Sequence, residues 1–288
     1  MNNDARRPHD LGSLRASLQA RLPALRASDA RVIQLVLDDP EFVRDARTAE
    51  VADRAQVSPA TVVRASRAAG FEGFAELRLA LHRATALRPD DHTPLAVTDS
   101  RTTADIQNAI LGSHAESVAA IRGTLDIDAL ERAIQAISDA DKVLLAGTST
   151  SHATAVDAVF RFRSVGLVVG MSRDDVSQQI QARLLGTKDV ALVISHSGRT
   201  ATSLQVARAA REVGAHVIAI TSYVESPLTE LATISLVAGG ADPGLEMTPS
   251  SSRIAHLTIV DMLHAGVALA DMERTRKASA ITAEVLGY

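Results

Sequence analysis

From residue 143 onward, short runs of apolar residues alternate with stretches of helical character. The runs are rich in β-branched residues, which favour strands, and their lack of polar alternation indicates strands buried on both faces. Such strands, separated by helices, are typical of a parallel sheet covered on both sides. The predicted strands are Val143–Ala146, Leu167–Gly170, Val190–Ser195, Val217–Thr221 and Ile234–Val237, and a long closing helix is expected over Ser252–Met272.

The first 85 residues instead predict several short helices, with Ser28-Asp29, Thr48 and Ser58 as N-cap residues. Between residues 86 and 104, prolines, aspartates and serines replace the apolar periodicity, as in a linker. A chain of 288 residues also exceeds what one core usually spans. We therefore expect an all-α domain over 1–85, a linker over 86–104 and an α/β domain over 105–288.

Residues Thr48–Arg67 have the spacing of a helix-turn-helix. The connection Gln56-Val57-Ser58 is too short for antiparallel helices, and the small Ala52 allows two helices to cross closely. Gln56 stands at the turn position where left-handed backbone would favour glycine. The outer face of the second helix suits a DNA major groove, although a plain three-helix bundle with a solvated arginine face remains the alternative. The expected DNA-contacting residues are Thr48, Ser58, Thr61, Arg64 and Arg67.

The charge distribution favours a nucleic-acid partner for the N-terminal part. The whole chain has a net charge of −4, but residues 1–88 carry 14 arginines against 11 acidic residues, a net charge of +3. Aromatic residues are only 2% of the chain, which argues against a single-strand binding surface built on base stacking. Double-stranded DNA is therefore the expected partner.

Several N-terminal segments, taken in order, resemble the helix-turn-helix domain of RpiR-family bacterial transcriptional regulators. The phrase Gly70-Phe71-Glu72-Gly73-Phe74-Ala75-Glu76-Leu77 after the second helix is the most specific of them. Phe71 and Phe74 are two of only five phenylalanines, so we expect them to anchor the small core. Ala65 departs from the resemblance, because the family usually carries phenylalanine there.

A second motif joins the strand that ends at Ser195 to the helix that follows. Hydroxyl side chains and Gly198 occupy this turn, and the N–H groups of a helix start bind anions, most naturally a phosphate. Thr148–Ser151 makes a similar loop after the first strand, and Thr221-Ser222 ends a third strand at the same sheet edge. The expected ligand residues are Gly147, Ser149, Ser151, Ser195, His196, Ser197, Gly198, Thr200 and Arg253.

Residues 105–275 resemble the SIS (sugar isomerase) domain, a phosphosugar-binding module. Ser195-His196-Ser197-Gly198-Arg199-Thr200 matches its S-x-S-G-x-T signature. The resemblance implies that Ser151, Ser195, Ser197 and Thr200 hold the phosphate. Ser149 stands where the family often has the second glycine of its first loop. An RpiR-type domain followed by a SIS domain is itself the layout of that regulator family.

An enzyme with this fold would need an acid and a base, and the candidates are His196, Glu246, His256 and His264. His256 and His264 lie about two turns apart on the closing helix, which suits packing or a subunit contact better than proton transfer. No spacing of histidines and carboxylates indicates a metal site, and the chain has no cysteine. We expect no catalytic residues, no metal and no cofactor.

The sequence therefore predicts a DNA-binding regulator of carbohydrate metabolism genes, controlled by a phosphorylated sugar. It would be a cytoplasmic homodimer or homotetramer on a palindromic operator, with no membrane span, because no apolar run approaches about 20 residues. Two alternatives remain: a sugar-phosphate isomerase or related SIS-fold enzyme, and a sugar-phosphate sensor that controls protein partners without DNA.

Overall fold

The computed structural model describes residues 11–86, 100–239 and 250–287, and for residues 86, 250 and 251 the backbone alone. Most of the predicted linker and the candidate Glu246 lie outside these ranges. The described chain forms two compact units. The first extends to Thr124 and takes in Tyr223–Glu225, and the second holds the sheet and the helices that cover it.

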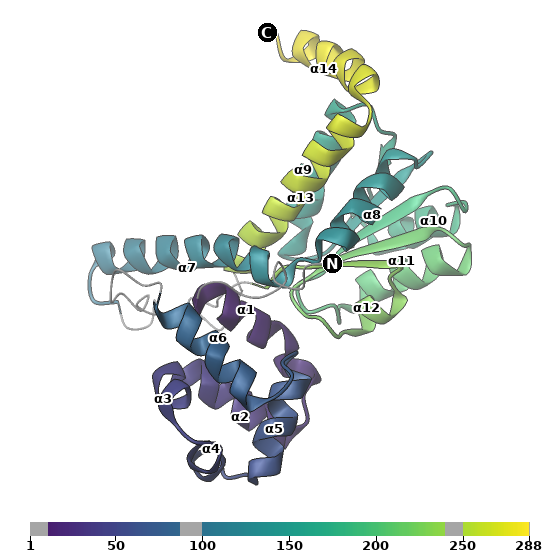
Figure 1. Ribbon diagram of the computed structural model, residues 1–288. Coiled ribbons are helices and arrows are strands. Elements are labelled where there is room, and N and C mark those ends of the chain that lie inside the picture. Colours follow the sequence, from purple (N-terminus) through teal and green to yellow (C-terminus); the bar gives the residue numbers. More distant parts are fainter. Residues whose placement is uncertain (1–10, 87–99, 240–249, 288) are drawn as a thin grey trace. The chain divides into compact units, whose positions relative to one another are not determined.

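The regular secondary structure described in the first unit is helical (Figure 1). It contains α1 (Leu11–Arg21), the 3₁₀ turn η2 (Leu22–Ala24), α2 (Ala27–Asp38), α3 (Pro40–Asp45), α4 (Thr48–Arg54), α5 (Pro59–Ala68), α6 (Phe74–Ala86) and α7 (Thr103–Thr124). Its core is formed by apolar residues of α1 to α6, including Leu14, Ile33, Val62 and Leu77. Phe74 is buried in this core and Phe71 packs against it half-buried, so the expected aromatic anchor is confirmed.

Helix α7 packs on α1, so the first unit extends beyond residue 104, where the sequence placed the start of the second domain. Its buried positions include Ala109, Ser113, Ser117 and Ala120, and such small side chains allow two helices to approach closely. A Cβ on Gly123 would lie 2.9 Å from the carbonyl oxygen of Ser13 on α1. The sequence shows this face of small residues but does not say which unit will cover it.

The second unit is built on a five-stranded parallel sheet with the order β2-β1-β3-β4-β5. The strands are β1 (Val143–Gly147), β2 (Val169–Gly170), β3 (Val190–Ile194), β4 (His216–Thr221) and β5 (Ile234–Val237). The helices are α8 (Ile127–Ser138), α9 (Ser151–Ser164), α10 (Asp175–Arg183), α11 (Ala201–Glu212), α12 (Pro227–Leu231), α13 (Ser250–Ala270) and α14 (Met272–Leu286). All five predicted strands are present, and the predicted fold class is confirmed.

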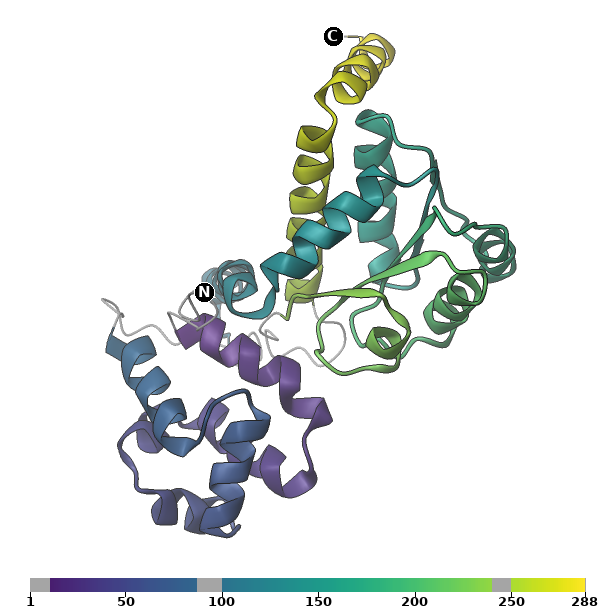
Figure 2. The ribbon, with the colours of Figure 1, turned by 45° about the vertical axis from the view of Figure 1, so that its right-hand side comes forward.

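Helices cover both faces of the sheet (Figures 1 and 2). Helices α10, α11 and α12 lie on one face, where Leu144, Ala191 and Val217 join their apolar residues in one cluster. Helices α8, α9 and α13 lie on the other face. Strands buried on both sides explain why their sequences read as continuous apolar runs.

Among the described residues, Ser252–Ala270 of α13 is the one segment long and apolar enough to cross a membrane by length and composition. Its buried residues Ile259, Val260, Leu263 and Val267 recur at helical spacing, as in a helix that lays one face on a core. The sequence did not predict α14, none of whose residues is buried.

Candidate functional site

Helices α4 and α5 form a helix-turn-helix whose turn depends on one strained residue. Gln56 has φ of 53°, the left-handed conformation that its position in the turn predicted. The Val57 N–H donates to the carbonyl of Ala52 over 2.9 Å, and Arg31 of α2 donates to the carbonyl of Gln56 over 3.2 Å. Ala52 is fully buried, as expected for the residue at a close helix crossing.

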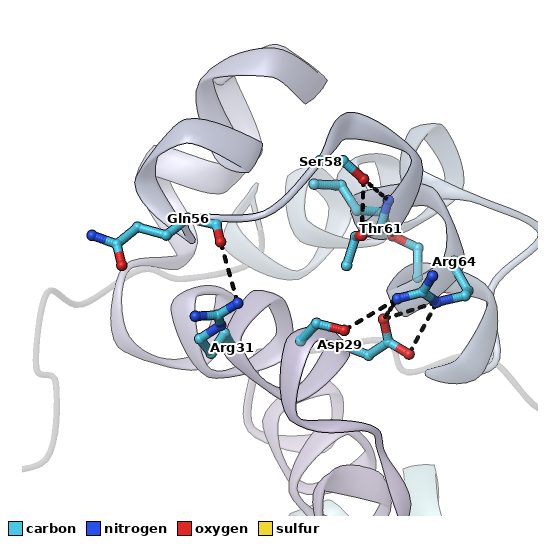
Figure 3. A network of polar contacts seen from close by, with 9 residues as sticks. Asp29, Arg31, Gln56, Ser58, Thr61 and Arg64 are labelled. Atoms are coloured by element: carbon cyan, nitrogen blue, oxygen red, sulfur yellow. Dashed lines mark hydrogen bonds and ion pairs between the residues drawn. The ribbon is translucent and has the colours of Figure 1, made fainter.

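The start of α5 differs from the expected arrangement at Thr61. Ser58 is the N-cap, and its Oγ accepts the Thr61 N–H over 3.2 Å, as predicted for a serine before proline. The expectation that Thr61 points outward was wrong, because the residue is only 8% exposed and its hydroxyl lies 3.0 Å from that of Ser58 (Figure 3). Position 61 falls on the same side of α5 as the core residues Val62 and Ala65.

Arg64 is exposed but ion-paired within the unit. Its side chain is 48% exposed, and Nη2 lies 2.7 Å from Oδ1 of Asp29, whose side chain is only 4% exposed. Nε lies 3.1 and 3.2 Å from the two Asp29 carboxylate oxygens, and Nη2 also donates to the Ser28 hydroxyl over 3.2 Å. The hydrogen bond to Asp29 raises the pKa of Arg64. Figure 3 shows how this pair joins α5 to α2.

Thr48 and Ser28-Asp29 do not cap their helices as expected. The N-cap of α4 is Arg47, whose N–H donates to the Glu50 carboxylate, and Thr48 is the first residue of the helix. The N-cap of α2 is Arg26, and Asp29 lies inside the helix, where it pairs with Arg64. Arg67 is exposed near the end of α5, and its Nε donates to the Glu72 carbonyl over 3.0 Å.

Asp29 was not predicted as the partner of Arg64, although the sequence holds a signal for it. Asp29 lies three, four and seven residues before Val32, Ile33 and Val36, and so on the buried stripe of α2. A carboxylate on a buried stripe needs a positively charged or hydrogen-bonding partner. The sequence alone does not say which arginine supplies it.

The hydroxyl-rich loops of the second unit meet at one edge of the sheet. Gly147 at the end of β1 pairs in register with Ile194 at the end of β3, and Ile194 pairs with Ile220 of β4. The segments that follow these strands are therefore neighbours at the carboxyl edge, where parallel sheets bind ligands. The Thr202 hydroxyl at the start of α11 lies 3.4 Å from that of Thr148 after β1.

The loop from Ser195 to Thr200 folds back on itself through hydrogen bonds between its own residues. The Ser195 hydroxyl donates to Thr200 Oγ1 over 3.3 Å, and the Gly198 N–H donates to the Ser195 carbonyl over 3.2 Å. Ser197 Oγ accepts the Arg199 N–H over 3.2 Å. Ser195 is buried, Ser197 is half-buried and Thr200 is exposed, so these residues extend from the protein interior to the surface.

Gly198 is required by its backbone conformation and by a close neighbour within the protein. It has φ of +62°, and an added Cβ would lie 2.6 Å from Cβ of Ser226. The close approach therefore comes from the protein's own Ser226. In the first loop, a Cβ on Gly147 would lie 2.8 Å from the carbonyl oxygen of Ser151, and Ser149 adopts φ of 53° where the family often has glycine.

The helices that follow the two loops begin without side-chain caps. Neither Thr150 before α9 nor Thr200 before α11 makes a side-chain cap hydrogen bond. Ser151 is buried in the first turn of α9. In the first turn of α11, the hydroxyl of Ser203 is buried with no hydrogen-bond partner among the described residues. In α9 the Ser151 and His152 N–H groups already donate to the carbonyls of Thr148 and Ser149. The unpartnered Ser203 hydroxyl and the first-turn N–H groups of α11 are therefore the donors best suited to an anion.

His196 and His256 come together, whereas His264 does not join them. Ser222 Oγ lies 2.8 Å from His196 Nδ1 and 3.1 Å from His256 Nε2. Burial, with a smaller contribution from His196, lowers the pKa of His256 to about 3. His264 lies two turns further along α13, and desolvation and then the charge of Arg161 lower its pKa. Arg253 is exposed on the first turn of α13.

Within residues 11–86, 100–239 and 250–287, no three histidine or acidic side chains cluster as metal ligands.

The fold and these two sites define a class of protein in which a helix-turn-helix domain is joined to a SIS domain. The model of the helix-turn-helix domain, rpiR family, matches residues 12–87, and the SIS domain model matches residues 136–265. An uncharacterized HTH-type transcriptional regulator of Haemophilus influenzae is 30% identical, over 84% of this chain and 85% of its own. The chain belongs to the rpiR family of helix-turn-helix transcriptional regulators.

Two further comparisons extend this picture. The bifunctional protein glk of Paraburkholderia xenovorans is 32% identical over 85% of this chain, which spans only 38% of that protein. The Vibrio vulnificus NanR protein, complexed with ManNAc-6P, has the same fold with a TM-score of 0.59 at 23% identity, over 95% of this chain and 97% of its own.

Proposed function

We propose that this regulator binds its operator through α5. Its affinity for the operator falls or rises when a phosphorylated sugar occupies the loops after β1 and β3. The observation that carries the proposal is the presence of two kinds of site in one chain. One is an arginine-bearing helix-turn-helix, and the other is a pair of hydroxyl-rich loops that open uncapped helices. A ligand can change DNA binding only by its different affinity for two arrangements of the protein.

The proposed DNA contacts are Ser58, Arg64 and Arg67, with Thr48 at the start of α4. Exposure supports Ser58, the N-cap of α5, and Arg67, near its end. The pairing of Arg64 with Asp29 leaves about half of its side chain exposed, so it can contact a phosphate while it holds α5 on α2. The buried Thr61 supports the helix start and makes no direct contact.

The proposed effector contacts are Ser151, Ser195, Ser197 and Thr200, to which we add Ser203. Their hydroxyls and the first-turn N–H groups of α11 suit a phosphate, which accepts several hydrogen bonds at once. Gly147, Ser149 and Gly198 shape the loops, and His196 and Arg253 are proposed to contact the rest of the ligand. The NanR complex with ManNAc-6P supports a sugar phosphate as the effector class.

We further propose that the chain does not turn over its ligand and that it acts in the cytoplasm. A buried His256 with its lowered pKa is suited to hydrogen bonding within the protein and not to proton exchange with a substrate. A palindromic operator would require at least two copies of α5 and hence a homodimer or homotetramer.

DNA binding is tested by gel shift on the DNA upstream of the chain's own gene, at several salt concentrations. We expect salt-steep binding that Arg67→Ala weakens, because a phosphate contact is lost. Arg122→Ala, an exposed arginine of α7, is the matched control and should leave binding unchanged. No mobility shift even at low salt would overturn the DNA-binding proposal and favour a sensor that acts on protein partners.

The effector site is tested by calorimetry with N-acetylmannosamine 6-phosphate, glucose 6-phosphate and inorganic phosphate as probes. Ser197→Ala should weaken phosphate binding by about 1–2 kcal/mol, because a hydrogen bond to a charged group is lost. Ser279→Ala, an exposed serine of α14, serves as the matched control. Undiminished binding in Ser197→Ala, or isomerisation of a probe sugar, would contradict the proposal.

A further inference from the structure

Two histidines and a serine from three different elements form a continuous polar chain beside the proposed effector loop. His196 belongs to the loop after β3, Ser222 follows β4, and His256 lies on α13. The serine hydroxyl contacts both rings, over 2.8 Å to Nδ1 of His196 and 3.1 Å to Nε2 of His256. The ring centroids are 6.5 Å apart and the ring planes are tilted by 42°, so the serine hydroxyl bridges two neighbouring rings.

His256 is the fixed end of this chain. It is 2% exposed, and burial lowers its pKa to about 3, so its ring is neutral at physiological pH. A neutral imidazole has one N–H donor and one acceptor nitrogen. A hydrogen bond to the main chain of Ala238, which follows β5, acts in the opposite direction and raises the pKa of His256. A backbone carbonyl that accepts a ring N–H has this effect.

These constraints determine which atom carries each proton in the hydrogen-bonded series His196–Ser222–His256. If His256 donates from Nδ1 to Ala238, its Nε2 is an acceptor and takes the Ser222 hydroxyl proton. The Ser222 oxygen then accepts, and its remaining neighbour, Nδ1 of His196, must carry a proton. The opposite direction would leave the Ala238 carbonyl without its donor, and a buried unpaired carbonyl is destabilising.

We infer that His256 is a positioning residue for the effector site, which through Ser222 holds His196 with its proton on Nδ1 and its ring in one orientation. This inference rests on the proposed function of the Ser195–Thr200 loop, because it assigns a purpose to the residue between Ser195 and Ser197. The main chain of His196 is held separately, since its carbonyl accepts from the Thr221 hydroxyl and the Ser222 N–H, each over 3.0 Å. What His256 adds is control over the ring.

The direct test is NMR of the histidine ring nitrogens in the full-length protein, without effector or DNA. In the wild type, Nδ1 of His196 should give the signal of a protonated nitrogen. Ser222→Ala removes the bridge and should produce a mixture of the two tautomers. Ser222→Thr retains the hydroxyl and should restore the wild-type signal, which loss of packing alone would not explain.

The second readout is the affinity for inorganic phosphate and N-acetylmannosamine 6-phosphate. His256→Phe retains an aromatic ring but removes the acceptor, so it should weaken sugar-phosphate binding about threefold to tenfold, as expected for one hydrogen bond. His256→Gln retains an acceptor and should lose less. His216→Gln changes an exposed histidine at the other end of β4 and should alter neither readout.

The inference would be overturned if wild-type His196 carried its proton on Nε2, or if its tautomer were unchanged in Ser222→Ala. If His256→Phe does not fold, the two Ser222 variants still provide the test. Failure of the proposed function is distinguishable from these results. Absence of phosphate binding together with the expected tautomer would reject the effector site and leave the hydrogen-bonded chain in place.

Discussion

Gln56 and Ser149 are the two residues in the described ranges, other than glycines, whose backbone is left-handed, each with φ of 53°. One lies in the turn before α5 and the other in the loop after β1. A side chain in this conformation is destabilised relative to glycine, because its Cβ crowds the following carbonyl. Both positions therefore keep a locally unfavourable conformation within a proposed binding site.

Replacing Gln56 by glycine should raise the free energy of unfolding of the first unit by up to about 1 kcal/mol, since the strain is relieved. The hydrogen bond from Arg31 is made to the main chain of Gln56 and should persist. Urea unfolding measures the change. Gln34→Gly in the middle of α2 is the matched control and should destabilise by about 1 kcal/mol. Equal destabilisation by both variants would show that Gln56 is not strained.

The variant Asp29→Asn tests whether Arg64 acts mainly as the ion-pair partner that holds α5 on α2 or mainly as a phosphate contact. If the ion pair holds α5 on α2, the variant should lower both the melting temperature and operator affinity, because the bidentate pairing is lost. If Arg64 acts only as a phosphate contact, its release should maintain or raise affinity. Thermal unfolding and gel shifts measure both effects, with Asp38→Asn at the exposed end of α2 as the control. We expect the first outcome.

At the residue scale, the sequence predicted positions determined by local chemistry. Ser58 as a cap before proline and Gln56 in a left-handed turn follow from neighbouring residues alone. Thr61 and Asp29 were assigned incorrectly because their environment depends on which side of α5 meets α2. That crossing is set by tertiary packing, which the printed sequence does not specify.

At the element scale, the contact between α13 and α8 is tight enough to require glycine. A Cβ on Gly266 would lie 2.7 Å from Cγ1 of Ile134, so the helices would have to separate or Ile134 would have to move. Gly266→Ala should therefore destabilise the second unit by about 1–3 kcal/mol, as overpacking does. Thermal unfolding would show it. The sign of the change in the free energy of unfolding distinguishes the two cases, because replacing glycine by alanine inside a helix without a close neighbour stabilises by about 1 kcal/mol.

The elements that the sequence predicted share a property that the missed one lacks. The strands are short, mostly apolar runs and each candidate loop follows a strand, so the order of apolar runs and polar turns predicted the sheet and the position of the proposed effector loops. Helix α14 buries no residue, so none of its positions marks a face that packs on the core. Helix α7 has a detectable face of small residues, but sequence periodicity does not identify the surface that it packs on.

At the scale of the whole molecule, His256 should make stability depend on pH. Its folded pKa of about 3 lies below the unfolded value of 6.5, so the unfolded chain binds more protons between these values. Its stabilising contribution is complete above pH 6.5 and decreases as pH falls towards 3, by roughly 1 kcal/mol per pH unit at the steepest.

Urea unfolding of the wild type and of His256→Gln at several pH values measures this dependence. The difference in stability between the two proteins should shift against the wild type as the solution becomes more acidic, because only the wild type has this buried ring to protonate. A difference that is constant from pH 7.5 to 4.5 would show that the ring titrates normally in the folded protein.

The attachment of α14 sets how the end of the chain behaves. None of its residues is buried, yet the Arg274 guanidinium donates to the carbonyls of Val165, Ser138 and Val267 over 3.2, 3.0 and 3.4 Å. The hydroxyls of Thr275 and Ser279 add hydrogen bonds to the carbonyls of Ala268 and Ser164. A helix that buries no residue and is held by a few side-chain hydrogen bonds can detach while the sheet stays intact. Its amide hydrogens should therefore exchange with solvent long before those of β3, and a protease could trim these last turns and leave a folded sensor behind.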